Sequence, residues 1–373
     1  MSRAGKWDIL RFHPTEGSQA LQKTGDTTIT LKDVASASGF SPATVSMVLN
    51  DAPLARYIPL ETKTHIRKMA KKLGYRPNAF ARSLRQQRSH TVGVLVCDLT
   101  DPYCTLILRG VESALSEATY LPIFTDFRNE PARFESHLEM LLDRRVEGLI
   151  VVANWLFLDI NLLSDLEKGR VPTTIIGRTI EKLSSVIVDN EAGAKAALEH
   201  LHSLGHRKIA FVRGPKAVVD SGERWAGVES AAKGLRIALD PRLIVDLPES
   251  QEPMAGFEWG SKLTTELVDR KRPFTALVAF DDMTAFGAIR ALSRAGIRVP
   301  DQCSVVGFDD VPAAALYSPS LTTVRQPMQS MGSAAVEILL AELRAAREHA
   351  KLPQRTHTAV PELVLRESTS AVG

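Results

Sequence analysis

The spacing of hydrophobic and polar positions along the chain changes near residue 91. Between residues 30 and 85, apolar residues recur at every third or fourth position, which is the period of amphipathic helices. From Val92 onward, short runs rich in β-branched residues alternate with amphipathic stretches long enough for helices of roughly 10 to 18 residues. The pattern predicts a small all-α unit, followed by an α/β body with parallel sheets.

The N-terminal unit opens with two predicted helices joined by a tight turn. Thr30 and Asp33 have the spacing of a capping box, which begins a helix, and Gly39 suits the left-handed conformation that ends it. Ser41 is a suitable N-cap for a second helix, because Pro42 at the first helical position lacks only an N–H that would go unused. This arrangement predicts a helix-turn-helix, although an ordinary hairpin of two helices has the same pattern.

A core for this unit follows from the same period. Val45, Val48 and Leu49 share one side of the second helix, and a third helix is expected from about Leu60 to Leu73. In the body, strands are predicted at 92–97, 121–125, 148–152, 173–176, 185–188, 208–212, 243–246, 276–280 and 303–308. About ten strands over roughly 280 residues are too many for one compact sheet, so we expect two lobes.

Charge is distributed unevenly between the two parts of the chain. Residues 27–91 carry eleven Lys or Arg residues and three acidic residues, a net charge of +8, whereas residues 92–373 carry −6 and the whole chain +3. A basic unit on an acidic body suggests that the small unit binds a polyanion, although a solvated basic face would look the same.

The composition disfavours several classes of protein. No apolar run approaches the ~20 residues that cross a bilayer, and the N-terminus lacks the apolar core of a signal peptide, so we expect a cytoplasmic protein without a membrane partner. Cys97, Cys104 and Cys303 have no metal-site or redox spacing and are expected to be reduced, buried thiols. No glycine-rich phosphate loop follows the first strand, and the three histidines between 200 and 206 mark a helix end. We therefore predict no cofactor, no metal and no enzymatic activity.

Two stretches of the chain resemble the lactose/galactose repressor family (LacI/GalR) of bacterial transcriptional regulators. LKDVASASGFSPATVSMVLN at 31–50 is similar to that family's headpiece, and LGYRPNAFARSL at 73–84 to its hinge segment. The resemblance extends over roughly residues 28–368 and implies a two-lobed core like that of periplasmic binding proteins. It also implies a homodimer that binds double-stranded, pseudo-palindromic operator DNA and is controlled by a small-molecule effector, with a sugar favoured over a purine.

The resemblance also assigns DNA-binding residues. The predicted set comprises Pro42, Ala43, Met47 and Asn50 facing base edges, Ser41, Thr44 and Ser46 at phosphates, and Asn78, Ala81, Arg82 and Leu84 in the hinge. In the family, the leucine at the position of Leu84 wedges into the minor groove and bends the DNA.

This head departs from the family pattern at two places. Met47 stands where a polar or cationic reader is usual, so more specificity should come from thymine-methyl contacts and DNA shape. The loop Asp51–Pro59 is longer than usual; we expect Arg56 and Tyr57 to pack against it, with phosphate contacts as the alternative.

The resemblance further implies an effector site in the body. The predicted residues are Tyr103, Cys104, Trp155, Arg178, Arg224, Asp281, Asp309 and Gln326. Arg224 lies in the stretch GERWAG, and Asp281 and Asp309 each begin an Asp-Asp pair at a strand end. Carboxylates and a guanidinium meeting in a cleft suit the vicinal hydroxyls of a polyhydroxylated ligand. Trp155 could stack on a sugar ring, or simply pack on the surface.

Two other functions remain open at this point. A solute-binding protein of the periplasmic type would leave the basic unit without a use and would need an export signal. A sugar- or nucleotide-dependent α/β enzyme would need a glycine loop or a nucleophile that the sequence does not offer. A DNA-binding regulator, more specifically a repressor, accounts for both parts of the chain.

The predicted domain boundaries combine the pattern and the resemblance. We expect a flexible extension at 1–27, the helix-turn-helix domain at 28–76, the hinge helix and linker at 77–90, and the body at 91–373. The first lobe should comprise about 91–188 and 319–350, and the second about 189–318 and 351–368.

Overall fold

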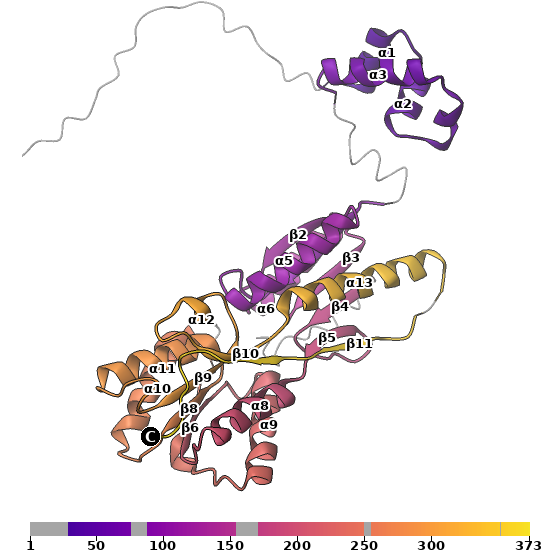
Figure 1. Cartoon of the computed structure of the whole chain (residues 1–373). Helices are drawn as coiled ribbons and strands as arrows, with labels where there is room; N and C mark the ends of the chain where they lie inside the picture. Colours follow the sequence, from indigo (N-terminus) through magenta and orange to yellow (C-terminus); the bar gives the residue numbers. More distant parts are fainter. Residues whose placement is uncertain (1–28, 76–87, 154–170, 250–254, 351) are drawn as a thin grey trace, which may run out of the picture. The chain divides into compact units, whose positions relative to one another are not determined.

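The computed structural model describes residues 29–75, 88–153, 171–249, 255–350 and 352–373 (Figure 1). The chain divides between Gln86 and Gln87 into two compact units, which we call the head and the body. Ser89 and His90, predicted as linker, are tied to the body. The Ser89 hydroxyl donates to the Arg145 carbonyl at 2.6 Å, and the His90 backbone N–H donates to the Glu147 carboxylate at 2.7 Å.

The head is a small helical unit, as its apolar period predicts. Its elements are α1 (Leu31–Ser38), α2 (Pro42–Leu49), a 3₁₀ turn η1 (Pro53–Tyr57) and α3 (Leu60–Lys72). The capping box is present, with the Thr30 N–H donating to Asp33 at 2.7 Å, and Gly39 ends α1 in the left-handed conformation at φ 74°. Ser41 caps α2 by accepting the Thr44 N–H at 3.1 Å. The buried core is formed by Val34, Ala35, Val45, Val48, Ile66 and Ala70.

The body contains two six-stranded sheets. The first has the order β11-β5-β4-β3-β1-β2, with all neighbours parallel. Its strands are β1 (Thr91–Val96), β2 (Leu121–Asp126), β3 (Gly148–Val152), β4 (Thr173–Ile176), β5 (Ser184–Val188) and β11 (Thr356–Ala359). The second has the order β12-β10-β9-β8-β6-β7, and only β12 pairs antiparallel. Its strands are β6 (Ile209–Arg213), β7 (Ile244–Asp246), β8 (Ala276–Ala279), β9 (Ser304–Asp309), β10 (Thr322–Arg325) and β12 (Glu362–Val364).

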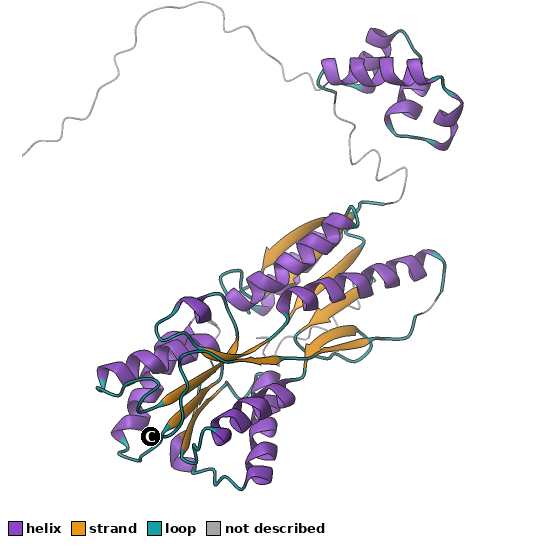
Figure 2. Ribbon diagram, in the orientation of Figure 1, coloured by secondary structure: helices purple, strands orange, loops and turns teal. Residues whose placement is uncertain are grey.

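Helices cover these sheets and bury their apolar residues (Figure 2). The first lobe carries α5 (Pro102–Glu117), α6 (Pro131–Asp143) and α13 (Met328–Arg347). The second carries α8 (Asn190–Ser203), α9 (Val219–Leu235), η2 (Pro241–Leu243), α10 (Gly256–Asp269), α11 (Asp282–Arg294) and α12 (Ala313–Leu316). Its core has two buried clusters, one with residues of α8 and α9 and the other with residues of α10 and α11.

The predicted lobe boundaries are wrong in the C-terminal third. β10 belongs to the second sheet, where it pairs with β9, and β11 belongs to the first, where it pairs with β5. The chain therefore crosses between the lobes near Asp189, at 326–327 and at 360–361, and not at 319 and 351. Local pattern could not show this, because β10 is a short buried strand and three of the four β11 residues are exposed.

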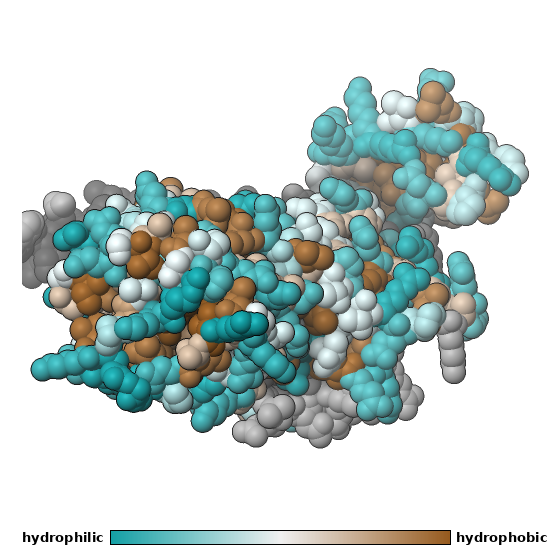
Figure 3. Space-filling view, turned by 60° about the horizontal axis from the view of Figure 1, so that its bottom comes forward, coloured by the Kyte–Doolittle hydropathy of each residue, from teal (hydrophilic) through white to brown (hydrophobic). Residues whose placement is uncertain are grey.

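The surface is mixed in polarity. Hydrophilic and apolar side chains are interspersed on the face drawn in Figure 3. None of the helices described is long and apolar enough to cross a membrane.

Candidate DNA-binding surface and effector site

One side of α2 is open to solvent, opposite the buried Val45 and Val48. Pro42 and Ala43 are exposed, and Met47 is partly exposed. The four polar members of the predicted surface on α2 and its cap, Ser41, Thr44, Ser46 and Asn50, already have partners among themselves. Thr44 is bonded to Ser41 between side-chain oxygens at 2.9 Å. The Asn50 amide donates to the Ser46 carbonyl at 2.8 Å, so Asn50 is held against its own helix and must turn to reach a base.

The long loop after α2 does not bury the two side chains expected to pack it. Tyr57 is 71% exposed. Arg56 donates to the Tyr57 hydroxyl at 2.8 Å and its guanidinium lies 4.7 Å from the ring centroid, so the two pack on each other. The loop is instead anchored by buried Ala55 and by an ion pair of 2.6 Å between Asp51 and Arg67. Of the other predicted residues, Asn78, Ala81, Arg82, Leu84 and Trp155 lie outside the described parts of the chain.

Arg224 is the centre of a polar cluster in the second lobe. It is 8% exposed and lies on α9. Its Nη1 donates to the Phe280 carbonyl at 2.6 Å and its Nε donates to the Asn190 side chain at 3.0 Å. The guanidinium lies 3.7 Å from the centroid of the Phe308 ring. These contacts hold the cation in one orientation, because each uses a different edge or face of the group.

Buried carboxylates surround this cation. Arg224 Nη2 lies 3.7 Å from Asp220 Oδ2 and 3.6 Å from Asp309 Oδ1. Burial raises the pKa of Asp220 to about 6, even though Arg224 opposes that shift. Burial also raises the pKa of Asp309 well above its usual range, and that of Asp281. The Gln326 side-chain N–H donates to Asp309 Oδ1 at 2.6 Å, while the side-chain oxygen of Gln326 has no partner among the described residues.

The first lobe contributes Tyr103 and Arg178 to the same region. Tyr103 is 4% exposed, and its hydroxyl has no hydrogen-bond partner within the described chain. Burial, together with the charges of Asp220 and Asp309 from the second lobe, raises the pKa of Tyr103. Burial lowers the pKa of Arg178, and the charge of Asp220 opposes this. Groups from both lobes therefore lie close enough to influence one another.

Cys104 is placed differently from Tyr103. It is fully buried, and its sulfur lies 3.8 Å from that of Cys97 and 3.7 Å from Asp101 Oδ2. All three cysteines are free and buried, as predicted.

Sequence reasoning missed several members of the cluster. Asp101 caps α5 by accepting the Tyr103 N–H at 2.9 Å, and burial raises the pKa of Asp101 to about 7. Asp220 and Asn190 were not selected either. Asp220 precedes Arg224 by four residues on α9, which is the spacing of an intrahelical ion pair and was the available signal. Asn190 carried no such signal.

The cluster has the chemistry of a binding site. No group of three or more potential ligands among the described residues could hold a metal ion. The histidines of the α8 end instead hold the C-terminal segment. His200 Nε2 lies 3.0 Å from Thr369 Oγ1, and His206 Nε2 lies 3.0 Å from the Ser370 carbonyl.

Known proteins resemble this chain over almost its whole length. A model of bacterial regulatory proteins, lacI family, matches residues 30–78, and one of the periplasmic binding protein-like domain matches residues 198–369. The HTH-type transcriptional repressor PurR of Haemophilus influenzae (strain PittEE) is 32% identical over 345 residues, which are 92% of this chain and 99% of the relative.

Solved structures agree with this match. The Lac repressor dimer bound to operator and the anti-inducer ONPF has a TM-score of 0.80 at 27% identity, covering 92% of this chain and 100% of that one. The complex of the transcriptional regulator CelR with cellobiose has a TM-score of 0.68 at 28% identity, covering 91% and 99%. A regulator from Enterococcus faecium with bound ribose has a TM-score of 0.64 at 27% identity, covering 76% and 100%. This chain therefore belongs to the LacI family of bacterial regulatory proteins and is a DNA-binding transcriptional repressor with an effector-binding domain.

Proposed function

We propose that the effector of this repressor is a sugar, bound between the two lobes at Arg224, Asp309 and Tyr103. The observation that carries the proposal is a buried guanidinium fixed among carboxylates and faced by an unpaired hydroxyl of the other lobe. Neighbouring sugar hydroxyls can donate to carboxylates and accept from a guanidinium at once, so they satisfy both kinds of group. The related structures that carry cellobiose or ribose support this choice.

A purine is the alternative effector. Phe280 and Phe308 could stack on a base, but the Arg224 guanidinium already lies 4.6 Å and 3.7 Å from the centroids of these rings, over one face of each. The remaining groups are mostly acceptors, and a sugar offers more donors to them than a purine does.

A thermal-shift screen of the full chain tests the effector class. Ligands that bind the folded state raise the midpoint of unfolding, by an amount that grows with concentration over Kd. We expect sugars, and not nucleobases, to do so. Asp309→Asn should then weaken binding of the same sugar at least about tenfold, since it removes a charged acceptor of nearly the same shape. Asp301→Asn, which removes an exposed pair with Arg298, is the matched control. If only purines raise the midpoint of unfolding, the effector is a purine and the proposal of a sugar is wrong.

We further propose that two copies, acting in the cytoplasm, bind a pseudo-palindromic operator through α2 and the segment 77–85. Two-fold symmetry of the protein then matches two-fold symmetry of the DNA. The exposed apolar side chains Leu121 and Phe124 on the edge strand β2, and Leu316 on α12, offer contact area to a second copy. Pro42, Ala43 and Met47 would face the bases, which gives the surface few hydrogen-bonding readers.

Substitutions at Ser41 separate helix capping from phosphate contact. Asn and Asp both replace Ser as N-caps with little loss of stability, but only Asp adds a negative charge. We expect Ser41→Asp to weaken binding of a random-sequence DNA duplex about tenfold at low salt, because the charge faces phosphates, and Ser41→Asn to leave it nearly unchanged. Fluorescence anisotropy measures both, and equal affinities for the two variants would contradict the proposed orientation of α2.

A further inference from the structure

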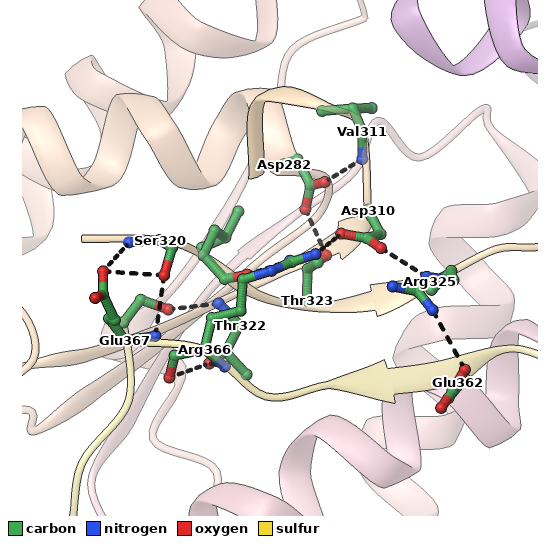
Figure 4. Close-up of polar contacts among 12 residues, drawn as sticks. Asp282, Asp310, Val311, Ser320, Thr322, Thr323, Arg325, Glu362, Arg366 and Glu367 are labelled. Carbon is green, nitrogen blue, oxygen red and sulfur yellow. Dashed lines mark hydrogen bonds and ion pairs between the residues drawn. The ribbon is translucent and has the colours of Figure 1, made fainter. Parts of the chain in front are cut away.

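The two Asp-Asp pairs contain one residue each that the effector site does not use. Asp281 and Asp309 lie near Arg224. Their successors, Asp282 and Asp310, contact other groups, although the sequence motif repeats them together (Figure 4). Asp282 is 1% exposed, and the Asp310 side chain is 8% exposed. Two such carboxyl groups need partners, because taking them out of water is costly unless they are hydrogen-bonded or paired.

Asp310 is held by two arginines. Arg366 Nη2 donates to its Oδ1 at 2.6 Å, and Arg325 Nε donates to its Oδ2 at 2.7 Å (Figure 4). Both carboxylate oxygens are therefore occupied. Arg366 is itself fixed, since its Nη1 donates to the Leu321 carbonyl at 2.7 Å, and Arg325 also pairs with Glu362 at 3.6 Å.

Asp282 holds the next residue of the same turn. Its Oδ2 accepts the Val311 N–H at 2.8 Å, and its Oδ1 accepts the Thr323 hydroxyl. The carboxylate lies directly over Gly307, where an added Cβ would stand 2.3 Å from Asp282 Oδ1. Space at Gly307 thus lets Asp282 reach across from α11 to β9 and β10.

The backbone between these anchors is strained. Asp309 has φ 114° and Asp310 has φ 59°, two consecutive residues other than glycine in the left-handed half of the map. Such a conformation costs free energy and persists only where its surroundings impose it. The turn at 309–311 also sets where the Asp309 carboxylate points, because the side chain follows the backbone direction at its Cα.

We propose that Asp310 is a positioning residue for the carboxylate of Asp309 in the effector site. The clamp formed by Arg325, Asp310 and Arg366, together with Asp282, imposes the strained turn that aims Asp309 at Arg224. The inference rests on the proposed effector site, and it divides each Asp-Asp pair between one residue that faces the ligand and one that builds the turn. The two clamp arginines come from β10 and from the segment after β12.

Hydrogen–deuterium exchange on the full chain tests this without an effector, so its result is independent of the effector class. Asp310→Asn removes the charge but keeps a residue that tolerates the left-handed conformation. We expect exchange of the amides at 309–311 and at Gln326 to rise at least tenfold, with amides of β6 and α10 unchanged. Asp301→Asn, which opens an exposed pair in the same lobe, should change none of them.

A second variant tests the same proposal in case Asp310→Asn does not fold. Arg325 is 46% exposed in its side chain, so Arg325→Gln is a milder change and should show the same local pattern with a smaller increase. Unchanged exchange at 309–311 in Asp310→Asn would overturn the proposal. A uniform rise across the second lobe would overturn it as well, because a residue that only stabilises the lobe would loosen β6 and α10 together with the turn.

Discussion

At the scale of single residues, this repressor gathers buried carboxylates beside few cations. Asp101, Asp220, Asp281 and Asp282 are buried and the Asp309 side chain is 13% exposed. Burial raises the pKa of each. Each of these carboxyl groups is harder to ionise in the folded chain than in the unfolded one, so its ionised form opposes folding. A binding site can carry this cost, because carboxylates such as Asp309 can accept further hydrogen bonds from a ligand with many donors.

Asp101 allows this cost to be measured. Its folded pKa of about 7 is higher than its ordinary value of 3.8, so its contribution to stability is complete below about pH 4 and is lost as pH rises through 7. Asparagine keeps the cap of α5 without the charge. We expect the free energy of unfolding of Asp101→Asn, relative to the wild type, to increase between pH 4 and pH 8 by up to about 4 kcal/mol. Urea unfolding across that range measures it, and a difference that does not vary with pH would show that the pKa of Asp101 is not raised.

At the scale of elements, three helix pairs of the body approach through glycines. An added Cβ would lie 2.0 Å from the Gln329 carbonyl oxygen at Gly110 of α5, 2.4 Å from the Glu191 carbonyl oxygen at Gly227 of α9, and 2.0 Å from the Phe257 carbonyl oxygen at Gly287 of α11. The obstructing atoms are backbone, so no rotamer change can relieve the clash. These glycines set the distance at which each helix packs on its neighbour.

Two alanine substitutions test this close packing. Gly287→Ala should destabilise the second lobe by about 1–3 kcal/mol or more, since α10 must move to admit the methyl group. Gly222 of α9 is exposed and has no atom within 4 Å of an added Cβ, so Gly222→Ala should be neutral or stabilising by up to about 1 kcal/mol. Thermal unfolding compares the two variants, and a similar loss in both would show that the close approach of α10 at Gly287 does not control the effect.

At the scale of the whole molecule, the head and the body are separate folding units. The head has its own core around Val45 and Ile66, and the body begins at Gln87. Ser89 and His90 form hydrogen bonds with the body. A truncated chain that keeps them should therefore fold better than one from which residues 1–90 are removed.

A chain of residues 87–373 tests this division. We expect it to keep the thermal stability of the body and to sediment as a dimer, because the exposed apolar residues of β2 and α12 remain. It should not bind DNA fragments that the full chain retains. Analytical ultracentrifugation and a pull-down of genomic fragments measure both properties. DNA retained by the truncated chain would contradict the assignment of binding to the head and the segment after it.

The amino-acid sequence by itself determined the features that depend on neighbours a few residues apart. The capping box at Thr30, the Ser41 cap and the end of α1 at Gly39 rest on hydrogen bonds that span three or four residues, so spacing alone predicts them. The two apolar periods likewise predicted the helical head and the strands of the body, and short motifs singled out Arg224, Asp281 and Asp309.

Only the tertiary structure decided relations between distant segments. It placed β10 and β11 in sheets that the sequence order does not suggest, exposed Arg56 and Tyr57, and brought Asn190 to Arg224. It also gave the second aspartate of each pair a different role, through a contact of Asp282 with Thr323 across 41 residues and one of Asp310 with Arg366 across 56. No local period encodes such contacts, because their energy depends on how the sheets pack and on which charges burial leaves side by side.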